Sequence, residues 1–496
     1  MSKKKLLTVF LFLVLTVTLT ALTTGCSQAE KEFVQLHEEI SKLNTMESSG
    51  QYLLSIKAPS LSPTATDSEV MLFNLLQKGI TLKYTNKADI EKDLLESSIF
   101  YVDKQMGTEQ EILKMLCKDD TLYFKIDELI KFAPKIGNPE TSAKLKEVFG
   151  DTEYIRLTKA EYLQLFTENK EQNPITKNML QNDTLLNNKF NRIVQRFMYG
   201  LPSAFENYQS DLIVKNGDGY TLEVTGMKAI EKLTPFLTYS INNMEKLEAY
   251  FISFLDNLTN DEMAALGLNS QQKDQYKMVC KMLTETISQN KAEYLQKAAA
   301  LQTELQKEKD KDNVKEMLNN LSLKYTIEKK GPDSYANYYK MQFLFKEKNE
   351  QVSFQAEVQN NIKPLTSLTV NVPTSKVMSY SELEQLITQT MEVQVDKKTC
   401  HFKNRKGAKQ EELNVLMIDN RTYLPLRKIA ETFEENVGWD SAQGKAYVLK
   451  NARKIDMTGT IIKGRTYIKI RDFEKLGYKV DWDDATRKVK ITVKAL

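Results

Sequence analysis

The sequence contains very few residues of the kind that bind transition metals. Its 496 residues include only two histidines, His37 and His401. A copper or zinc site built from three histidines is therefore impossible within one chain. The two histidines lie far apart in the sequence, and neither has a visible catalytic partner. We expect no metal and no cofactor.

Cysteine is equally scarce. Apart from Cys26, the chain has only Cys117, Cys280 and Cys400. An odd and widely spaced set of this kind argues against a disulfide framework or a CxxC metal site. Stability must come from packing, for which the chain is long enough.

The chain also lacks a strong net charge and recognisable catalytic motifs. It has 69 basic and 66 acidic residues, so the broad basic field that nucleic-acid binding requires is missing. A P-loop, a GxGxxG loop, an HExxH helix and a serine nucleophile elbow are all absent from the sequence. We therefore predict a protein that is not an enzyme and does not bind nucleic acid.

The N-terminus has the parts of an export signal. Lys3–Lys5 precede an apolar run, Leu6–Leu22, and Gly25–Cys26 follows it. This order resembles a bacterial lipoprotein signal, with Thr23 at the position where leucine is usual. The resemblance implies that residues 1–25 are removed and that Cys26 carries acyl chains such as palmitate. We expect a protein anchored by lipid to the extracytoplasmic face of the cell membrane.

Two other interpretations of this segment stay open. The apolar run of about 17 residues is at the short end of what can span a bilayer, so it could be an uncleaved helical anchor. Plain secretion is the third possibility. Two acyl chains on Cys26 would anchor the protein stably, which one chain would not.

The middle of the chain predicts an α+β body, antiparallel sheet plus helices, over residues 51–378. Residues 26–50 are expected to form a tether or helix. Strand patterns flank a helical stretch over about 228–320, and the turn Asn216–Gly219 predicts a hairpin. Alternating apolar residues around 339–345 and 352–358 predict a second hairpin. Ser379 and Glu382 indicate a capping box that begins a linker helix over 379–390.

The last hundred residues contain one pattern twice. Ile418–Arg427 and Ile462–Arg471 share the sequence Arg-Thr-Tyr, and each copy is followed by a Trp-Asp pair at Trp439 and Trp482. These are the only tryptophans in the chain, so their equivalent positions indicate a true duplication. Turns at 419–420 and 463–464 and an apolar face at helical spacing predict a ββαββ-like unit in each copy.

These residues resemble the copper amine oxidase-like N-terminal domain, also called the stalk domain. The resemblance covers about 391–496 and is carried by Arg421–Arg427, Val437–Asp440 and Val480–Asp483. In copper amine oxidases this domain is a non-catalytic appendage, and their chemistry needs three histidine ligands. Amine oxidation is therefore rejected here. The resemblance implies a role in cell-envelope interaction or scaffolding.

Several repeat residues are candidates for contact with a ligand or partner. Each tryptophan could stack on a sugar ring of wall polymer, but we favour a role as a core anchor. Arginine at the start of a helix opposes the helix dipole, so we expect a carboxylate partner for it. Asp440 and Asp483 are expected to cap their own turns. The candidate residues are Trp439, Trp482, Tyr423, Tyr467, Arg427 and Arg471.

The favoured function is a membrane-anchored lipoprotein whose stalk domain binds wall polymer or an envelope protein. A first alternative is a carrier that holds a lipid or other apolar ligand between the sheet and helices of the body. An apolar cavity there would favour the carrier. A cell-wall hydrolase is a second alternative, because a close carboxylate pair cannot be picked from 66 acidic residues by sequence alone.

Overall fold

The computed structural model describes residues 27–58, 67–104, 106–136, 139–162, 188–205, 207–309, 311–347, 350–404, 407–450 and 453–494. The chain divides into two compact units. The body unit comprises residues 1–60, 73–129 and 157–374, and the C-terminal unit comprises 61–72, 130–156 and 375–496. The predicted signal and Cys26 lie outside the described residues. In the described part of the chain, no helix is both long enough and apolar enough to cross a membrane.

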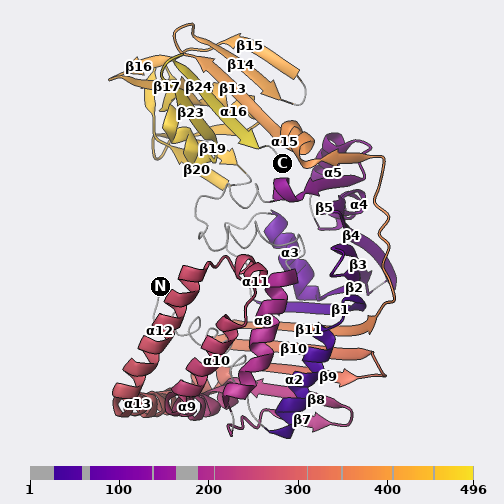
Figure 1. Cartoon of the computed structure of the whole chain (residues 1–496). Coiled ribbons are helices and arrows are strands. Elements are labelled where there is room, and N and C mark those ends of the chain that lie inside the picture. The colour runs from indigo at the N-terminus through magenta and orange to yellow at the C-terminus, as the bar shows by residue number, and fades with distance from the viewer. Residues whose placement is uncertain are drawn as a thin grey trace. The chain divides into compact units, whose positions relative to one another are not determined.

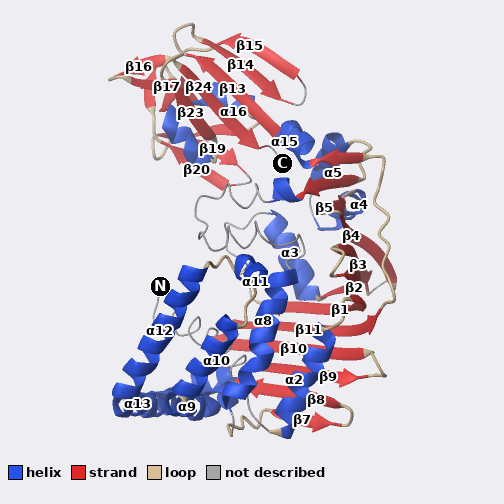
Figure 2. Cartoon of the chain, in the orientation of Figure 1, coloured by secondary structure: helices blue, strands red, loops and turns tan. Residues whose placement is uncertain are grey.

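The body unit contains a large antiparallel sheet, in agreement with the predicted α+β class (Figure 2). Its strands are β1 (Thr45–Lys57), β2 (Ile80–Asp89), β3 (Leu94–Asp103), β4 (Thr108–Lys118), β5 (Thr121–Lys125), β7 (Ile213–Asn216), β8 (Gly219–Thr225), β9 (Ser322–Lys329), β10 (Tyr335–Glu347) and β11 (Glu350–Pro364). They hydrogen-bond in the order β5-β4-β3-β2-β1-β11-β10-β9-β8-β7. The first strand of the chain is thus paired on one side with the last strand of the body.

The chain between the β7–β8 hairpin and β9 is helical. The helices of the body unit cover one face of the sheet. The expected helical stretch is confirmed as α9 to α14. In Figure 1, α2 and α8 run side by side across the strands, and α12 lies at the outer edge of the helical group. The helices are α2 (Gln28–Ser41), α8 (Asn188–Gly200), η1 (Leu201–Phe205), α9 (Gly226–Asn242), α10 (Met244–Asp256), α11 (Asn260–Ala265), α12 (Ser270–Gln289), α13 (Lys291–Lys309) and α14 (Asp312–Asn319).

Both predicted hairpins of the body are confirmed. Gly217 takes a φ of 58° in the β7–β8 turn, a left-handed conformation that glycine adopts without a steric cost. The segment after Cys26 differs from a free tether. Phe33 and Leu36 of α2 are buried in the same core as Leu212 and Ile327, because these apolar residues recur on one helical face. Residues 45–50 already belong to β1.

The remaining elements connect or complete the two units. α3 (Asp67–Lys78) and α4 (Asp127–Ile136) have residues in both units, whereas α5 (Pro139–Phe149) belongs to the C-terminal unit. β6 (Tyr154–Thr158) pairs in parallel with β12 (Val377–Ser379). The helix predicted after Ser379 is present as α15 (Tyr380–Ile387), with the predicted capping box between Ser379 and Glu382, and it belongs to the C-terminal unit.

The C-terminal unit contains the two repeats in the predicted order of strand, strand, helix, strand, strand. Around them, β13 (Thr388–Gln394), β14 (Thr399–Asn404), β15 (Gly407–Glu412) and β20 (Arg453–Met457) complete three small antiparallel sheets. The first copy is β16 (Leu416–Ile418), β17 (Arg421–Pro425), α16 (Leu426–Thr432), β18 (Asn436–Asp440) and β19 (Lys445–Lys450). The second is β21 (Thr460–Ile462), β22 (Arg465–Lys469), η2 (Ile470–Leu476), β23 (Lys479–Asp483) and β24 (Lys488–Lys494).

The two copies are joined through their second strands. β17 and β22 pair antiparallel at the centre of a four-stranded sheet, with Leu424 opposite Ile468. Both side chains are fully buried in one core together with Ile429, Phe473 and Val489. The two repeats therefore share a single hydrophobic core.

Candidate functional site

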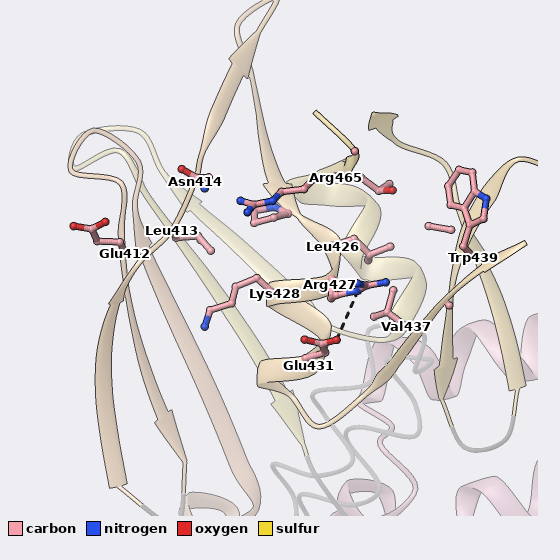
Figure 3. Close-up of a pocket in the computed structure, with 15 residues that line it drawn as sticks. Glu412, Leu413, Asn414, Leu426, Arg427, Lys428, Glu431, Val437, Trp439 and Arg465 are labelled. Carbon is pink, nitrogen blue, oxygen red and sulfur yellow. Dashed lines mark ion pairs between the residues drawn. The ribbon is translucent and has the colours of Figure 1, made fainter. Parts of the chain in front are cut away.

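A pocket of about 600 Å³ opens in the C-terminal unit between the two repeats. Figure 3 shows the start of α16 lying between the segment that carries Leu413 and the strand that carries Trp439. The second repeat supplies Gly464, Arg465 and Thr466 from the turn and start of β22. The pocket is lined by Glu412, Leu413, Asn414, Pro425, Leu426, Arg427, Lys428, Glu431, Val437, Gly438, Trp439, Ala446, Gly464, Arg465 and Thr466.

The two equivalent tryptophans have different environments. Trp482 is partly buried, packs against the shared core, and its indole N–H donates to Asp484 at 3.3 Å. Trp439 is 47% exposed and lines the pocket. The core-anchor role fits Trp482, but it does not describe Trp439. An exposed indole beside a concavity is a surface on which a planar or ring-shaped ligand can stack.

The charged side chains that line the pocket are three cations, Arg427, Lys428 and Arg465, and two carboxylates, Glu412 and Glu431. Arg427 pairs with Glu431 at 3.7 Å, and Lys428 pairs with Glu411, which lies just outside the pocket. Hydrogen bonds from Lys409 and Lys428 lower the pKa of Glu411 to about 2, so this carboxylate stays ionised. Arg465 is exposed and has no ion pair with any residue that the structure describes. Its planar guanidinium can bind a carboxylate or phosphate in a bidentate manner.

Gly438 gives the pocket wall its shape. It lies opposite Tyr447 in the β18–β19 ladder. A Cβ atom at Gly438 would lie 2.2 Å from Cζ of Tyr447, so the tyrosine ring occupies the space of a side chain. Lys454 lies 4.8 Å from the centroid of that ring and pairs with Asp440. The strand that presents Trp439 is thereby fixed to β19 and β20.

The other candidate residues do not meet in the pocket. Tyr423 and Tyr467 are 8% and 5% exposed and lie on β17 and β22, the two central strands of the four-stranded sheet. Arg471 donates to the Val480 carbonyl and pairs with Glu474 at 3.0 Å. The expected carboxylate partners of Arg427 and Arg471 are therefore present, although both pairs are exposed and contribute little to stability.

Other expectations about the repeat motif are also resolved. Asp440 accepts hydrogen bonds from the backbone N–H groups of Ala442 and Gln443. Asp483 does the same for Ala485 and Thr486, so the turn-capping role is confirmed for both. Sequence reasoning did not single out Arg465 or Lys428 as site residues. Arg465 was visible only as part of the repeated Arg-Thr-Tyr pattern.

Among the described residues, no group of three or more His, Cys, Asp or Glu side chains is arranged to hold a metal ion. Among the carboxyl groups that the structure describes, the one with a raised pKa is that of Glu435, because burial opposes its ionisation. Its charged neighbour is Lys450 at 3.5 Å, and this pair lies outside the pocket.

The comparisons with known proteins identify the C-terminal region. The family model of the copper amine oxidase N-terminal domain matches residues 385–448, 402–460 and 448–495. The first and last of these matches each contain one copy of the repeat. No curated protein and no solved structure matches the chain. Residues 385–495 therefore carry a copper amine oxidase N-terminal domain, which is a non-catalytic part of the oxidases after which it is named.

Proposed function

We propose that this protein is an extracytoplasmic lipoprotein whose C-terminal domain binds anionic glycan of the cell wall. The observation that carries this proposal is the exposed indole of Trp439 in a pocket that also contains Arg427 and Arg465. Aromatic rings stack on the apolar faces of sugars, while guanidinium groups bind the acidic substituents. The ligand would be a sugar chain that bears phosphate or carboxylate groups.

The difference between the two repeats supports a binding role for the first. A tryptophan with 47% exposure leaves much apolar surface in water, which is unfavourable without a ligand. Trp482 occupies the equivalent position and is packed against the core. The duplicated unit therefore does not require an exposed tryptophan for its fold. The exposure of Trp439 is a property of the pocket.

The shape of the site favours a polymer segment over a flat protein surface. Small-molecule and polymer ligands bind in concave sites in which a few polar groups fix the orientation. Here the cations of α16 and β22 lie on the same pocket as the indole (Figure 3). A protein partner with its own exposed acidic side chains is the competing interpretation, and the experiment below separates the two.

The proposed anchor is Cys26, followed at once by the folded body. Ser27 caps α2, and its backbone N–H donates to Glu30 at 2.8 Å. A lipid on Cys26 would thus hold the body unit close to the membrane, without a long tether. Radiolabelled palmitate incorporation tests this directly, and the Cys26→Ser variant should abolish it. No specific observation on the described residues favours a cell-wall hydrolase.

The glycan proposal is tested by titrating purified wall glycan into the mature chain. Isothermal titration calorimetry measures binding in every variant, because intrinsic fluorescence combines the signals of both tryptophans and is lost at Trp439 in the Trp439→Ala variant. Trp439→Ala and Arg465→Ala should each weaken binding by about tenfold or more. The matched control is Leu449→Ala, which changes another exposed side chain of the same sheet (41% exposed).

Two further arms identify the acidic group and the class of partner. Glycan freed of phosphate should lose affinity if phosphate is recognised, and amidation of its carboxyl groups should do so if carboxylate is recognised. Wall glycan that binds the Trp439→Ala variant as well as the original chain would contradict the proposal. So would a pull-down in which Trp439 is needed for a protein partner and wall glycan does not compete.

A further inference from the structure

The helices of the body unit line a second hollow, of about 290 Å³, which is open to solvent and has an apolar and aromatic lining. It lies between α8, α10, the end of α11 and α12. Ile193 and Leu255 form its floor and are 3% and 4% exposed. Val194 and Tyr276 are at its rim and are 39% and 42% exposed. A lining without any charged side chain favours a hydrocarbon ligand over an ion.

The aromatic walls of this hollow are fixed in place. The ring of Phe197 packs edge-on against Phe254, with a centroid distance of 5.0 Å, and against Phe251 at 6.3 Å. The hydroxyl of Tyr250 donates to the backbone carbonyl of Phe197 and so ties α10 to α8. The hollow is therefore formed before any ligand enters, and binding needs little reorganisation.

Apolar surface continues from the hollow along α12. Tyr276, Val279 and Leu283 follow one another at helical spacing and are 42%, 48% and 54% exposed. The charged side chains Lys273 and Lys277 instead turn toward Asp256 of α10. This helix thus exposes several apolar side chains to solvent, whereas an ordinary surface helix turns such side chains toward the core. Such an exposed stripe marks a binding surface.

Ion pairs lie on residues next in sequence to the lining, because Arg196 precedes Phe197, Asp256 follows Leu255 and Lys277 follows Tyr276. Lys273 and Lys277 share the single carboxylate of Asp256. Arg196 lies 5.7 Å from the centroid of the Phe254 ring and pairs with Glu262 at 2.8 Å. In these ion pairs three cations share two carboxylates. An apolar chain that ends in an anion would complement both properties.

We infer that this hollow binds the single hydrocarbon chain of an anionic amphiphile, such as a fatty acid. The chain lies in the hollow and along the stripe of Tyr276, Val279 and Leu283. The headgroup lies at the Lys273–Lys277 and Arg196 side. The volume of about 290 Å³ suits one chain better than a complete two-chain lipid. The site lies among helices, not between the sheet and helices as the carrier alternative expected, and it is independent of the glycan pocket.

The test uses the mature chain with Cys26→Ser, so that no detergent is needed, and dansyl-labelled undecanoate as a fluorescent probe. The probe should bind with one-to-one stoichiometry. Laurate should displace it at least about tenfold better than dodecyltrimethylammonium, which has the same chain with a cationic head. Arg196→Gln should weaken laurate binding and leave dodecanol binding unchanged.

Two variants test whether the probe binds in this hollow. Val194→Asp and Tyr276→Asp add a charge at exposed rim positions, where folding tolerates it, and each should weaken probe binding by about tenfold or more. The matched control is Val214→Asp on β7, an exposed valine (55%) outside the hollow. Circular dichroism and the Tm should stay unchanged in all three variants.

Three results would overturn the inference. The first is probe binding that Val194→Asp and Tyr276→Asp leave unaltered. The second is a dimer in light scattering that Val194→Asp dissociates, because a second copy of the chain would then cover the hollow. The third is sedimentation with anionic vesicles without binding of monomeric laurate, which would make the stripe a membrane-contact surface.

Discussion

His37 on α2 and Tyr325 on β9 are 288 residues apart in the sequence, and Nε2 of His37 lies 2.7 Å from the tyrosine hydroxyl. Nδ1 of the same ring lies 2.8 Å from the carbonyl oxygen of Phe33. A carbonyl can only accept, so Nδ1 carries a proton. Burial favours the neutral imidazole by lowering the pKa of His37, and in that form Nε2 accepts from the Tyr325 hydroxyl. The contact joins the first described helix to the sheet.

This pair predicts a pH dependence of stability. Burial lowers the pKa of His37 from 6.5, so the unfolded chain binds a proton at a higher pH than the folded chain does. The stabilisation is complete above the ordinary pKa and is lost as the pH falls through 6.5 toward the folded value. Urea unfolding at pH 7.5 and pH 5.5 should show a smaller pH effect for His37→Phe than for the original chain.

Two comparisons keep this prediction specific. His401→Gln removes the other histidine, which is exposed on β14, and should leave the pH effect unchanged. Tyr325→Phe removes one hydrogen bond and should cost about 1 kcal/mol at pH 7.5. An unchanged pH effect in His37→Phe would show that other groups cause it.

A second prediction concerns Glu30, a fully buried carboxylate of α2. It accepts the backbone N–H of Ser27 at 2.8 Å and that of Ser210 at 2.9 Å. Glu30→Gln places an amide N–H₂ against one of these donors and should cost about 1–3 kcal/mol of unfolding free energy. Glu38→Gln, on the exposed side of the same helix, should cost little. Chemical unfolding of both variants measures the difference.

The third prediction compares the helix ends of the two repeats. Gly477 has a φ of 74°, and Glu434, at the equivalent position of the first copy, has a φ of 64°. A side chain in this left-handed region costs roughly 1 kcal/mol relative to glycine. Glu434→Gly should therefore be more stable than Glu434→Ala by about 1 kcal/mol, while both variants lose the same carboxylate. Gly477→Ala should be destabilised by a similar amount, and equal Tm values for the two Glu434 variants would contradict this account.

The fourth prediction tests the packing behind Trp439. Gly438→Ala forces the Tyr447 ring to move and should cost about 1–3 kcal/mol. In Gly438→Ala with Tyr447→Ala, the clash is absent, so the double variant should lose less than the sum of the two single variants. Thermal unfolding of the four proteins gives this coupling. Strict additivity would mean that the ring does not press against residue 438.

Local chemistry in the sequence was enough to predict the repeats. The turns at 419–420 and 463–464 have positive φ at both residues, as two-residue hairpins require. The left-handed residue that ends the helix of the first copy is Glu434, at the position of Gly477 in the second copy. An unfavourable residue at such a position carries no signal in a single sequence.

Long-range arrangement could not be predicted in the same way. β3 was missed because Leu94–Asp103 is interrupted by polar residues, and its pairing with β2 and β4 decides its conformation. The different exposure of Trp439 and Trp482 depends on which side chains surround them in three dimensions. Arg465 became a site residue only when β22 paired with β17 and brought it to the pocket of the first repeat.

The pairing of β1 with β11 determines when the body can be completed during synthesis. Met46 lies opposite Pro364, so β1 leaves the ribosome long before β11, one of its two neighbours, has been synthesised. Such distant contacts slow the closing of a sheet. An incomplete chain that stops before β11 would have an unpaired edge along β1, which is a template for aggregation. If the chain is exported, transport before closure would match this order of events, since the sheet would then form after the whole body has crossed the membrane.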